Sequence, residues 1–198
     1  MREEFEKIFV TYIKRDGAKE LLDYLGKSDF FTTPASAKYH CAYRGGLCEH
    51  SVNVYRRLLG YVREEYGESW EKTYSHESVA ICGLLHDLCK IDYYVEETRN
   101  VKVDGEWVQK PYYAINEILP YGHGEKSVYI ISGFMRLTRS EAMAINWHMG
   151  GFDDRVRGGC FSISSAYEKE PLCVLLHMSD LIATYLDEHR NKRKEEIK

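Results

Sequence analysis

Hydrophobic residues recur at helical spacing along most of the chain. From the N-terminus to about Leu25 they return every three or four positions, and Asp16-Gly17 divides this stretch into two expected short helices. The following segment, residues 30–46, shows no such period, and its proline and two glycines exclude a long helix. The chain is therefore predicted to begin with two short helices and an irregular loop.

Helical spacing returns further along the chain and predicts five longer helices. One region between them differs, because RNVKVDGEWVQKPYY, within residues 93–115, alternates polar and apolar positions around Asp104-Gly105. That dipeptide between alternating strands is a strong signal for a β-hairpin. The sequence predicts an all-α helical bundle with one small inserted β-hairpin, its helices spanning about 47–66, 77–88 (with Ser75 or His76 near the cap), 124–137, 140–147 and 171–188.

Composition places these elements in one soluble domain of 198 residues. We expect residues 1–29 to be a helical extension, residues 30–188 the core, and residues 189–198 a charged tail; the whole run EHRNKRKEEIK, from Glu188, is expected to be a solvated end. Hydrophobic residues at 44% and charged residues at 29% argue against disorder, and a net charge of -4 gives no overall attraction to nucleic acid or acidic membranes.

Six cysteines are present without a CxxC pair, and neither a secretory signal nor an apolar run of membrane-spanning length is visible. The chain is expected to be cytoplasmic, with reduced thiols and no membrane partner.

The first candidate for chemistry is GLLHDLCK, residues 83–90. Neighbouring helical residues point about 100° apart, so His86 and Asp87 reach one point only at a helix edge or end. Lys90, four residues after His86, returns to the same face. Buried charges are costly unless they bind something. The alternative is a polar cluster that caps a helix and binds nothing.

Two other segments contribute residues of the same kind. His50 opens an amphipathic helix in GGLCEHSVNVY, and Asp180 lies within the otherwise apolar LCVLLHMSDLIATYL. An aspartate in such a helix requires a partner. A metal ion bound by His50, His86, Asp87 and Asp180 would satisfy all four groups.

This pattern of a His, a His-Asp pair and a distant Asp on separate helices resembles the HD superfamily of metal-dependent phosphohydrolases. The segment FFTTPASAKYHCAYRGGLCEHS also resembles the entry to the HD domain of 3′–5′ exoribonucleases that join an OB-fold to an HD domain, and the likeness covers about residues 30–188. The chain departs from those nucleases because no OB-fold, which grips single strands, precedes the core. It also lacks the GYP motif of HD-type cyclic-dinucleotide phosphodiesterases.

The resemblance implies that His123 and His148 hold a second ion, with Asp87 bridging both. The alternative is that His123 caps a helix and His148 contacts substrate or the core. Imidazole and carboxylate ligands suit Mn, Fe, Ni, Co or Zn, with Mg also possible, and two such ions can activate water and clamp a phosphate.

Four side chains are candidates for binding substrate: Lys90, Lys126, His40 and Arg44. The alternatives are a surface ion pair for Lys90, a solvated helix position for Lys126, and loop packing for the other two. With Asp87 and Lys90 as catalytic residues, we expect a hydrolase of a phosphomonoester or phosphodiester, its substrate a small phosphorylated molecule, such as a nucleotide, or a short nucleic acid.

Two other functions stay open. The same ligands would serve a di-iron oxygenase of the HD type, and an HD protein can also be a non-catalytic binding module. The hairpin is expected to border the pocket and select substrate, because loops set specificity on a shared scaffold.

Overall fold

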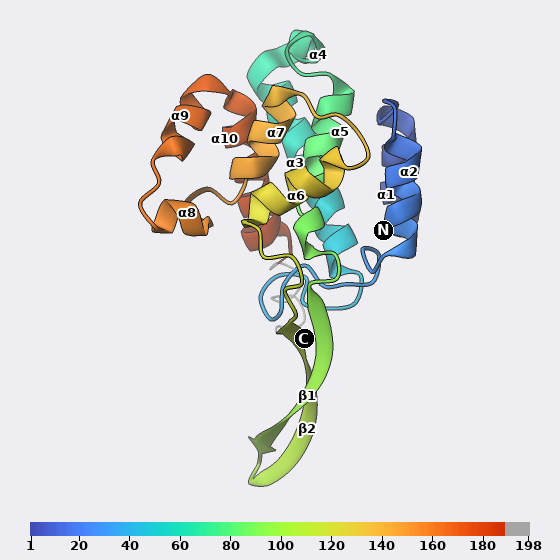
Figure 1. Cartoon of the computed structure of the whole chain (residues 1–198), viewed down its shortest axis with the longest axis vertical. Coiled ribbons are helices and arrows are strands. Elements are labelled where there is room, and N and C mark those ends of the chain that lie inside the picture. The colour runs from blue at the N-terminus through green and yellow to red at the C-terminus, as the bar shows by residue number, and fades with distance from the viewer. Residues whose placement is uncertain (189–198) are drawn as a thin grey trace.

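A computed structural model describes residues 1–188, so the tail predicted for residues 189–198 lies outside the described residues. This part of the chain is mostly helical, with one two-stranded antiparallel sheet (Figure 1). The elements are α1 Arg2–Tyr12, α2 Ala18–Lys27, α3 Gly46–Tyr66, η1 Gly67–Ser69, α4 Trp70–Thr73, α5 His76–Leu85, η2 Leu88–Lys90, β1 Tyr94–Val103, β2 Glu106–Ile115, α6 His123–Ser132, α7 Arg139–Trp147, η3 Gly150–Phe152, α8 Asp154–Arg157, α9 Ser162–Lys169, α10 Pro171–Ile182 and the π-helical turn η4 Ala183–Asp187.

The long helix α3 forms the centre of the bundle. It packs against α5 and α10, α10 packs against α7, and α7 packs against α6. Leu58, Leu84, Ile145 and Leu176 are fully buried where these helices meet. This packing brings the C-terminal ends of α5 and α7 close to the N-terminal end of α6. None of the helices in residues 1–188 is both long enough and apolar enough to cross a membrane.

The N-terminal helices belong to the same hydrophobic core. The prediction of two short helices is confirmed, and Phe5 of α1 and Leu21 of α2 are both fully buried. The connection between the helices is held by Arg15, whose guanidinium bonds to Glu141 of α7 at 2.7 and 2.9 Å and to Glu77 of α5 at 3.2 Å. Because Glu141 is fully buried, this link joins α1 and α2 firmly to the bundle.

Two predicted helix ends are wrong, and the last helix contains a turn that was not predicted. The helix expected over 77–88 begins at a Ser75 cap but ends at Leu85, immediately before the His-Asp pair. The helix expected over 124–137 ends at Ser132, and residues after Gly133 form a loop. The last helix changes at Ala183 into a π turn, which adds one residue to the helical turn. Helices α8 and α9 were not predicted, because they are short and weakly patterned.

The predicted hairpin is confirmed. Strands β1 and β2 pair along ten residues each, with Val103 opposite Glu106. Asp104 and Gly105 have φ angles of 51° and 92°, the left-handed conformation that a two-residue type I′ turn requires. Figure 1 shows the hairpin as a long arm that extends away from the helices.

Candidate metal centre

The structure brings all six expected ligands to one place. His50 lies in the second turn of α3, and Asp180 lies in α10. The pair His86 and Asp87 directly follows α5. His123 is the first residue of α6, and His148 directly follows α7. Four of the six residues are buried, whereas the side chain of Asp180 is 16% exposed and that of His123 is 31% exposed.

One group of ligands gathers around His50. Its Nε2 atom lies 3.3 Å from His86 Nε2, 3.2 Å from Asp180 Oδ1 and 3.6 Å from Asp87 Oδ2. His86 Nε2 is itself 3.7 Å from Asp87 Oδ2. His50, His86 and Asp87 thus lie close enough together to hold a metal ion, and Asp180 contacts the same nitrogen of His50.

A second group meets the other oxygen of the same aspartate. Asp87 Oδ1 lies 2.9 Å from His123 Nε2 and 3.4 Å from His148 Nε2. The histidines of the two groups thus face different oxygens of Asp87, which both groups share. This is the arrangement expected of a carboxylate between two ligand sets, and residues of each set lie close enough together to hold a metal ion.

Hydrogen bonds to the backbone orient two of the imidazoles. His86 Nδ1 lies 3.0 Å from the Gly83 carbonyl oxygen, and His148 Nδ1 lies 2.7 Å from that of Ile145. Since a carbonyl oxygen only accepts, each Nδ1 must carry the proton, and each Nε2 presents a lone pair to the cluster. His148 Nε2 is buried and has no hydrogen-bond partner among residues 1–188.

A carboxylate not expected from the sequence contacts the other side of the His50 ring. Glu188 was assigned to the solvated tail, but this residue is 7% exposed and its Oε1 lies 2.9 Å from His50 Nδ1. The π turn explains its position, because one extra residue makes its eight-residue separation from Asp180 equivalent to seven, which is two helical turns. Asp180 and Glu188 therefore contact opposite nitrogens of the His50 ring.

These contacts point to a positive charge between His50 and His86. With Nδ1–H of both rings donating to oxygen, two nitrogen lone pairs would face each other across 3.3 Å. Such lone pairs repel unless a proton or a metal ion lies between them. The donor set, three or more imidazole nitrogens with carboxylate oxygens, is the one that divalent transition metals prefer. The residues present therefore fit a metal ion.

The pKa values of the cluster also indicate that the site holds a positive charge beside His50. Burial would raise the pKa of Asp87, but Lys90 and His86 outweigh it and hold this pKa well below its usual range. Burial would likewise raise the pKa of Glu188, but His50 lowers it to about 2. Burial alone would lower the pKa of His50, whereas Glu188 and Asp180 raise it to about 10. Without a metal ion the carboxylates keep their charge and His50 takes up the missing positive charge.

Two close helix contacts set the spacing of the histidines. A Cβ atom at Gly83 would lie 2.5 Å from Tyr55 Cα, and one at Gly124 would lie 2.2 Å from the Asn146 carbonyl oxygen. Neither backbone has room to move, so α5 approaches α3 and α6 approaches α7 only because these positions are glycine. The two glycines lie within three residues of His86 and His123.

A cavity of about 340 Å³ opens beside the second group. Lys90 and His123 are among the residues that line it. Lys90 Nζ is 2.5 Å from Asp87 Oδ2, and Asp87 raises the pKa of this lysine against the effect of burial. Lys126 is buried, with its Nζ 2.7 Å from Glu117 Oε1, so it is not a solvated lysine. The other lining residues are Cys89, Tyr93, Glu117, Pro120, Tyr121, Gly122, Met149, Phe152, Asp153, Asp154 and Arg155.

His40 and Arg44, the two candidates that precede His50 in the sequence, lie in different surroundings. The His40 ring packs against His50, with 4.8 Å between ring centres, and its Nε2 is buried without a partner in the described residues. Burial lowers the pKa of His40 to about 3, so the ring is neutral. Arg44 is exposed, and within residues 1–188 it makes no hydrogen bond or ion pair with the cluster. Arg44 lies on the loop directly before α3, and its exposed side chain does not line the cavity.

The hairpin meets the cavity only at its base. Tyr93 and Glu117, which flank the strands, line the cavity, and no residue of β1 or β2 does so. Of the segment predicted to form the hairpin, residues 93–115, Tyr93 thus borders the cavity, whereas the strands themselves extend outward from the helices (Figure 1).

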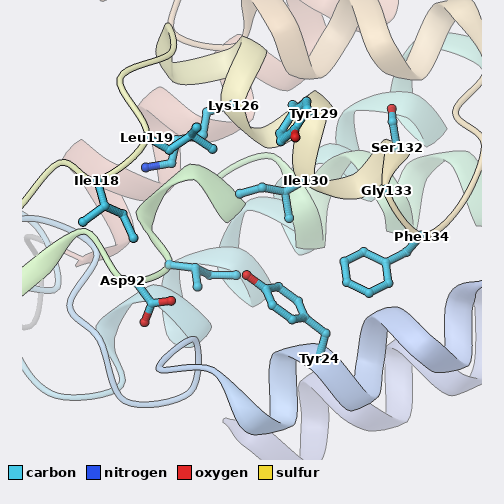
Figure 2. A pocket seen from close by; sticks show the side chains of 11 residues that line it. Tyr24, Asp92, Ile118, Leu119, Lys126, Tyr129, Ile130, Ser132, Gly133 and Phe134 are labelled. Atoms are coloured by element: carbon cyan, nitrogen blue, oxygen red, sulfur yellow. The ribbon is translucent and has the colours of Figure 1, made fainter.

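A larger groove of about 550 Å³ lies elsewhere, between α2 and α6. Tyr24, Ile130 and Phe134 line it, and Figure 2 shows these side chains facing one another across an open space. Among the described residues, none of the six expected ligands lines this groove. The smaller cavity differs in that one of the expected ligands, His123, is among the residues that line it.

Comparisons of the chain with protein-family models, with curated proteins and with solved structures found no match.

Proposed function

We propose that this chain is a metal-dependent phosphohydrolase of the HD superfamily. The observation that carries the proposal is Asp87, one oxygen of which faces His50 and His86 while the other faces His123 and His148. With Asp180 completing the first set, these residues would hold two divalent ions chosen from Mn, Fe, Ni, Co, Zn or Mg. Such ions supply an activated water and neutralise the charge of phosphate oxygens.

The substrate proposed is a small phosphomonoester or phosphodiester, such as a nucleotide or a very short nucleic acid. Its support is the cavity of about 340 Å³, which has the size of a small-molecule site and is lined in part by Lys90 and His123. Lys90 would donate to a phosphate oxygen and stabilise charge as the bond to phosphorus breaks. Lys126 lies at the first turn of α6, where backbone amides also favour an anion.

Water attacks phosphorus in this reaction, and the oxygen of the leaving alcohol takes up a proton. The residues of the chain contribute through their charge and orientation. Asp87 keeps its negative charge in a buried site, and Lys90 and His123 each hydrogen-bond to a different oxygen of its carboxylate. His86 and His148 need no rearrangement to offer Nε2, because their Nδ1 protons are already bound to carbonyls. Preorganisation of this kind is the main contribution a protein makes to electrostatic catalysis.

Metal analysis combined with a substrate screen tests the proposal. The full chain, loaded with each metal in turn, is assayed against phosphomonoesters, phosphodiesters, nucleotides and short RNA. We expect about two ions per chain and hydrolysis of at least one class. Asp87→Asn should abolish both, whereas Asp23→Asn, at an exposed carboxylate of α2 that lines no part of this cavity, should retain both.

Two outcomes would contradict the proposal. A folded, metal-loaded protein that hydrolyses none of these substrates would favour a non-catalytic binding module. Iron-loaded protein with the spectrum of an oxidised di-iron centre and turnover that consumes O₂ would favour the oxygenase, which the same ligands also suit.

A further inference from the structure

The hairpin β1–β2 stands apart from the metal centre and from the core. Each strand has ten residues, and most of them are exposed on both faces. Trp107 is 71% exposed, and Val95, Val103 and Val108 are each 37% exposed. A lone two-stranded ribbon of this length is marginally stable in water, and a long exposed edge readily pairs with another strand. The arm therefore has the properties of an interaction surface.

The two edges of the arm are not equivalent. In a hairpin with a two-residue turn, the flanking pair, here Val103 and Glu106, exchanges both hydrogen bonds, and the bonded and non-bonded pairs then alternate. Thr98 and Pro111 consequently form a non-bonded pair, and the Pro111 nitrogen faces the outer edge of β2. Because proline lacks an N–H, this edge is blocked against a further strand.

The outer edge of β1 has no such block. By the same alternation, Glu96, Thr98 and Asn100 direct their backbone N–H and C=O groups away from β2. No other strand pairs with β1 within residues 1–188. The arm thus presents one complete, unpaired strand edge.

We propose that this edge pairs with the same edge of a second copy, antiparallel and centred on Thr98, to form a four-stranded sheet. In that register Glu97 lies opposite Arg99 of the second copy, twice by symmetry, and Val95 lies opposite its Val101. A shift of two residues would place Arg99 opposite itself or Glu97 opposite itself. A shift of one residue would mismatch the outward backbone groups. Among the registers within two residues of this one, charge and hydrogen bonding therefore both favour the register centred on Thr98.

The charged side chains are already held on the correct face. The Tyr112 hydroxyl donates to Glu97 Oε2 at 2.6 Å, and the Arg99 guanidinium lies 5.2 Å from the centre of the Tyr112 ring. A carboxylate accepts several hydrogen bonds, so Glu97 can bind Tyr112 and a second copy's Arg99 together. Opposite charges placed directly across two strands stabilise their pairing, and like charges oppose it.

Sedimentation of the full chain over a range of concentrations tests the proposal. The unmodified protein should form a dimer reversibly. Glu97→Arg should raise the dissociation constant at least about tenfold, because two attractive pairs become repulsive. The double variant E97R/R99E should restore dimerisation, since it reverses both charges. Glu106→Arg makes the same change on the same face but on β2, and should leave the dimer intact.

A second variant tests the backbone hydrogen bonds of the outer edge of β1 independently of the charged side chains. Thr98→Pro removes an N–H that faces outward, so the hairpin should persist, by circular dichroism, while the dimer is lost. Metal content should be unchanged in all variants, which makes the result independent of the proposed hydrolase activity. A protein that is monomeric at every concentration, or a dimer that survives both E97R and T98P, would overturn the proposal.

Discussion

Glu188 provides the sharpest test of how the metal centre is built. Its carboxylate lies 2.9 Å from His50 Nδ1, and its side chain is 1% exposed. In Glu188→Gln the amide oxygen can still accept the Nδ1 proton, so the hydrogen bond persists and only the charge is lost. The variant therefore measures what a buried negative charge behind the imidazole contributes to metal binding.

The expected magnitude follows from two opposing effects. Loss of a carboxylate partner behind a ligating histidine costs roughly 10- to 100-fold in metal affinity. Glu188 also helps to raise the pKa of His50 to about 10, so at neutral pH it stabilises the proton that a metal ion must displace. A doubly charged ion gains more from the carboxylate than a proton does. We expect a loss of about tenfold at pH 7 that grows at pH 9, where the proton competes less.

Competition against a chelating dye at both pH values measures this loss. Asp187→Asn is the matched control, because the neighbouring carboxylate pairs with Arg57 and not with the cluster. Its metal affinity should equal that of the unmodified protein. Equal affinities for Glu188→Gln and the unmodified protein at both pH values, or an equal loss in the control, would refute the role assigned to Glu188.

Three further predictions concern the site and its support. The His50 pKa of about 10 lies above the ordinary value, so the stability that His50 contributes to the metal-free protein is complete below about pH 6.5 and is lost as the pH rises towards 10. The melting temperature of the metal-free protein, measured over this pH range, should fall accordingly. Calorimetry at pH 7 should detect about one proton released when the metal binds. Lys90→Met should lower kcat/KM about 100-fold with metal retained, because Lys90 stabilises phosphate charge; metal loss instead would mean that the lysine serves only to hold Asp87. Arg15→Ala should lower the free energy of unfolding by about 3 kcal/mol, because it removes the charged partner of the buried Glu141. Urea titration measures this loss, and unchanged metal affinity would confirm that the effect is structural.

Several features of the fold were predictable because their signals are local. Asp104-Gly105 determines the hairpin by its backbone conformation alone, and Asp16-Gly17 marks the break between α1 and α2. Asp180 was identified because a charged residue in an apolar helix requires a partner. These predictions needed no knowledge of packing between distant segments.

The features that were not predicted depend on distant contacts. Glu188 stands at the start of a charged run, and nothing in that run indicates the π turn that directs its side chain to His50. The end of α5 at Leu85 was missed because the apolar period continues through Leu88, which is buried in the following 3₁₀ turn. Arg44 was expected beside His50 because it is close in sequence, but its exposed side chain does not line the cavity.

The C-terminal ends of α5 and α7 help to explain why the site would select a cation. His86 and His148 each stand one residue beyond a helix, and each ring donates its Nδ1 proton to the carbonyl three residues before it. One bond thus satisfies a carbonyl of the last turn and directs Nε2 at Asp87. The negative ends of the α5 and α7 dipoles meet at Asp87, where they stabilise positive charge, and the positive end of α6, which begins at His123, opposes them there. The same backbone feature that ends α5 and α7 therefore supplies both the ligand geometry and part of the field that would hold the metal ions.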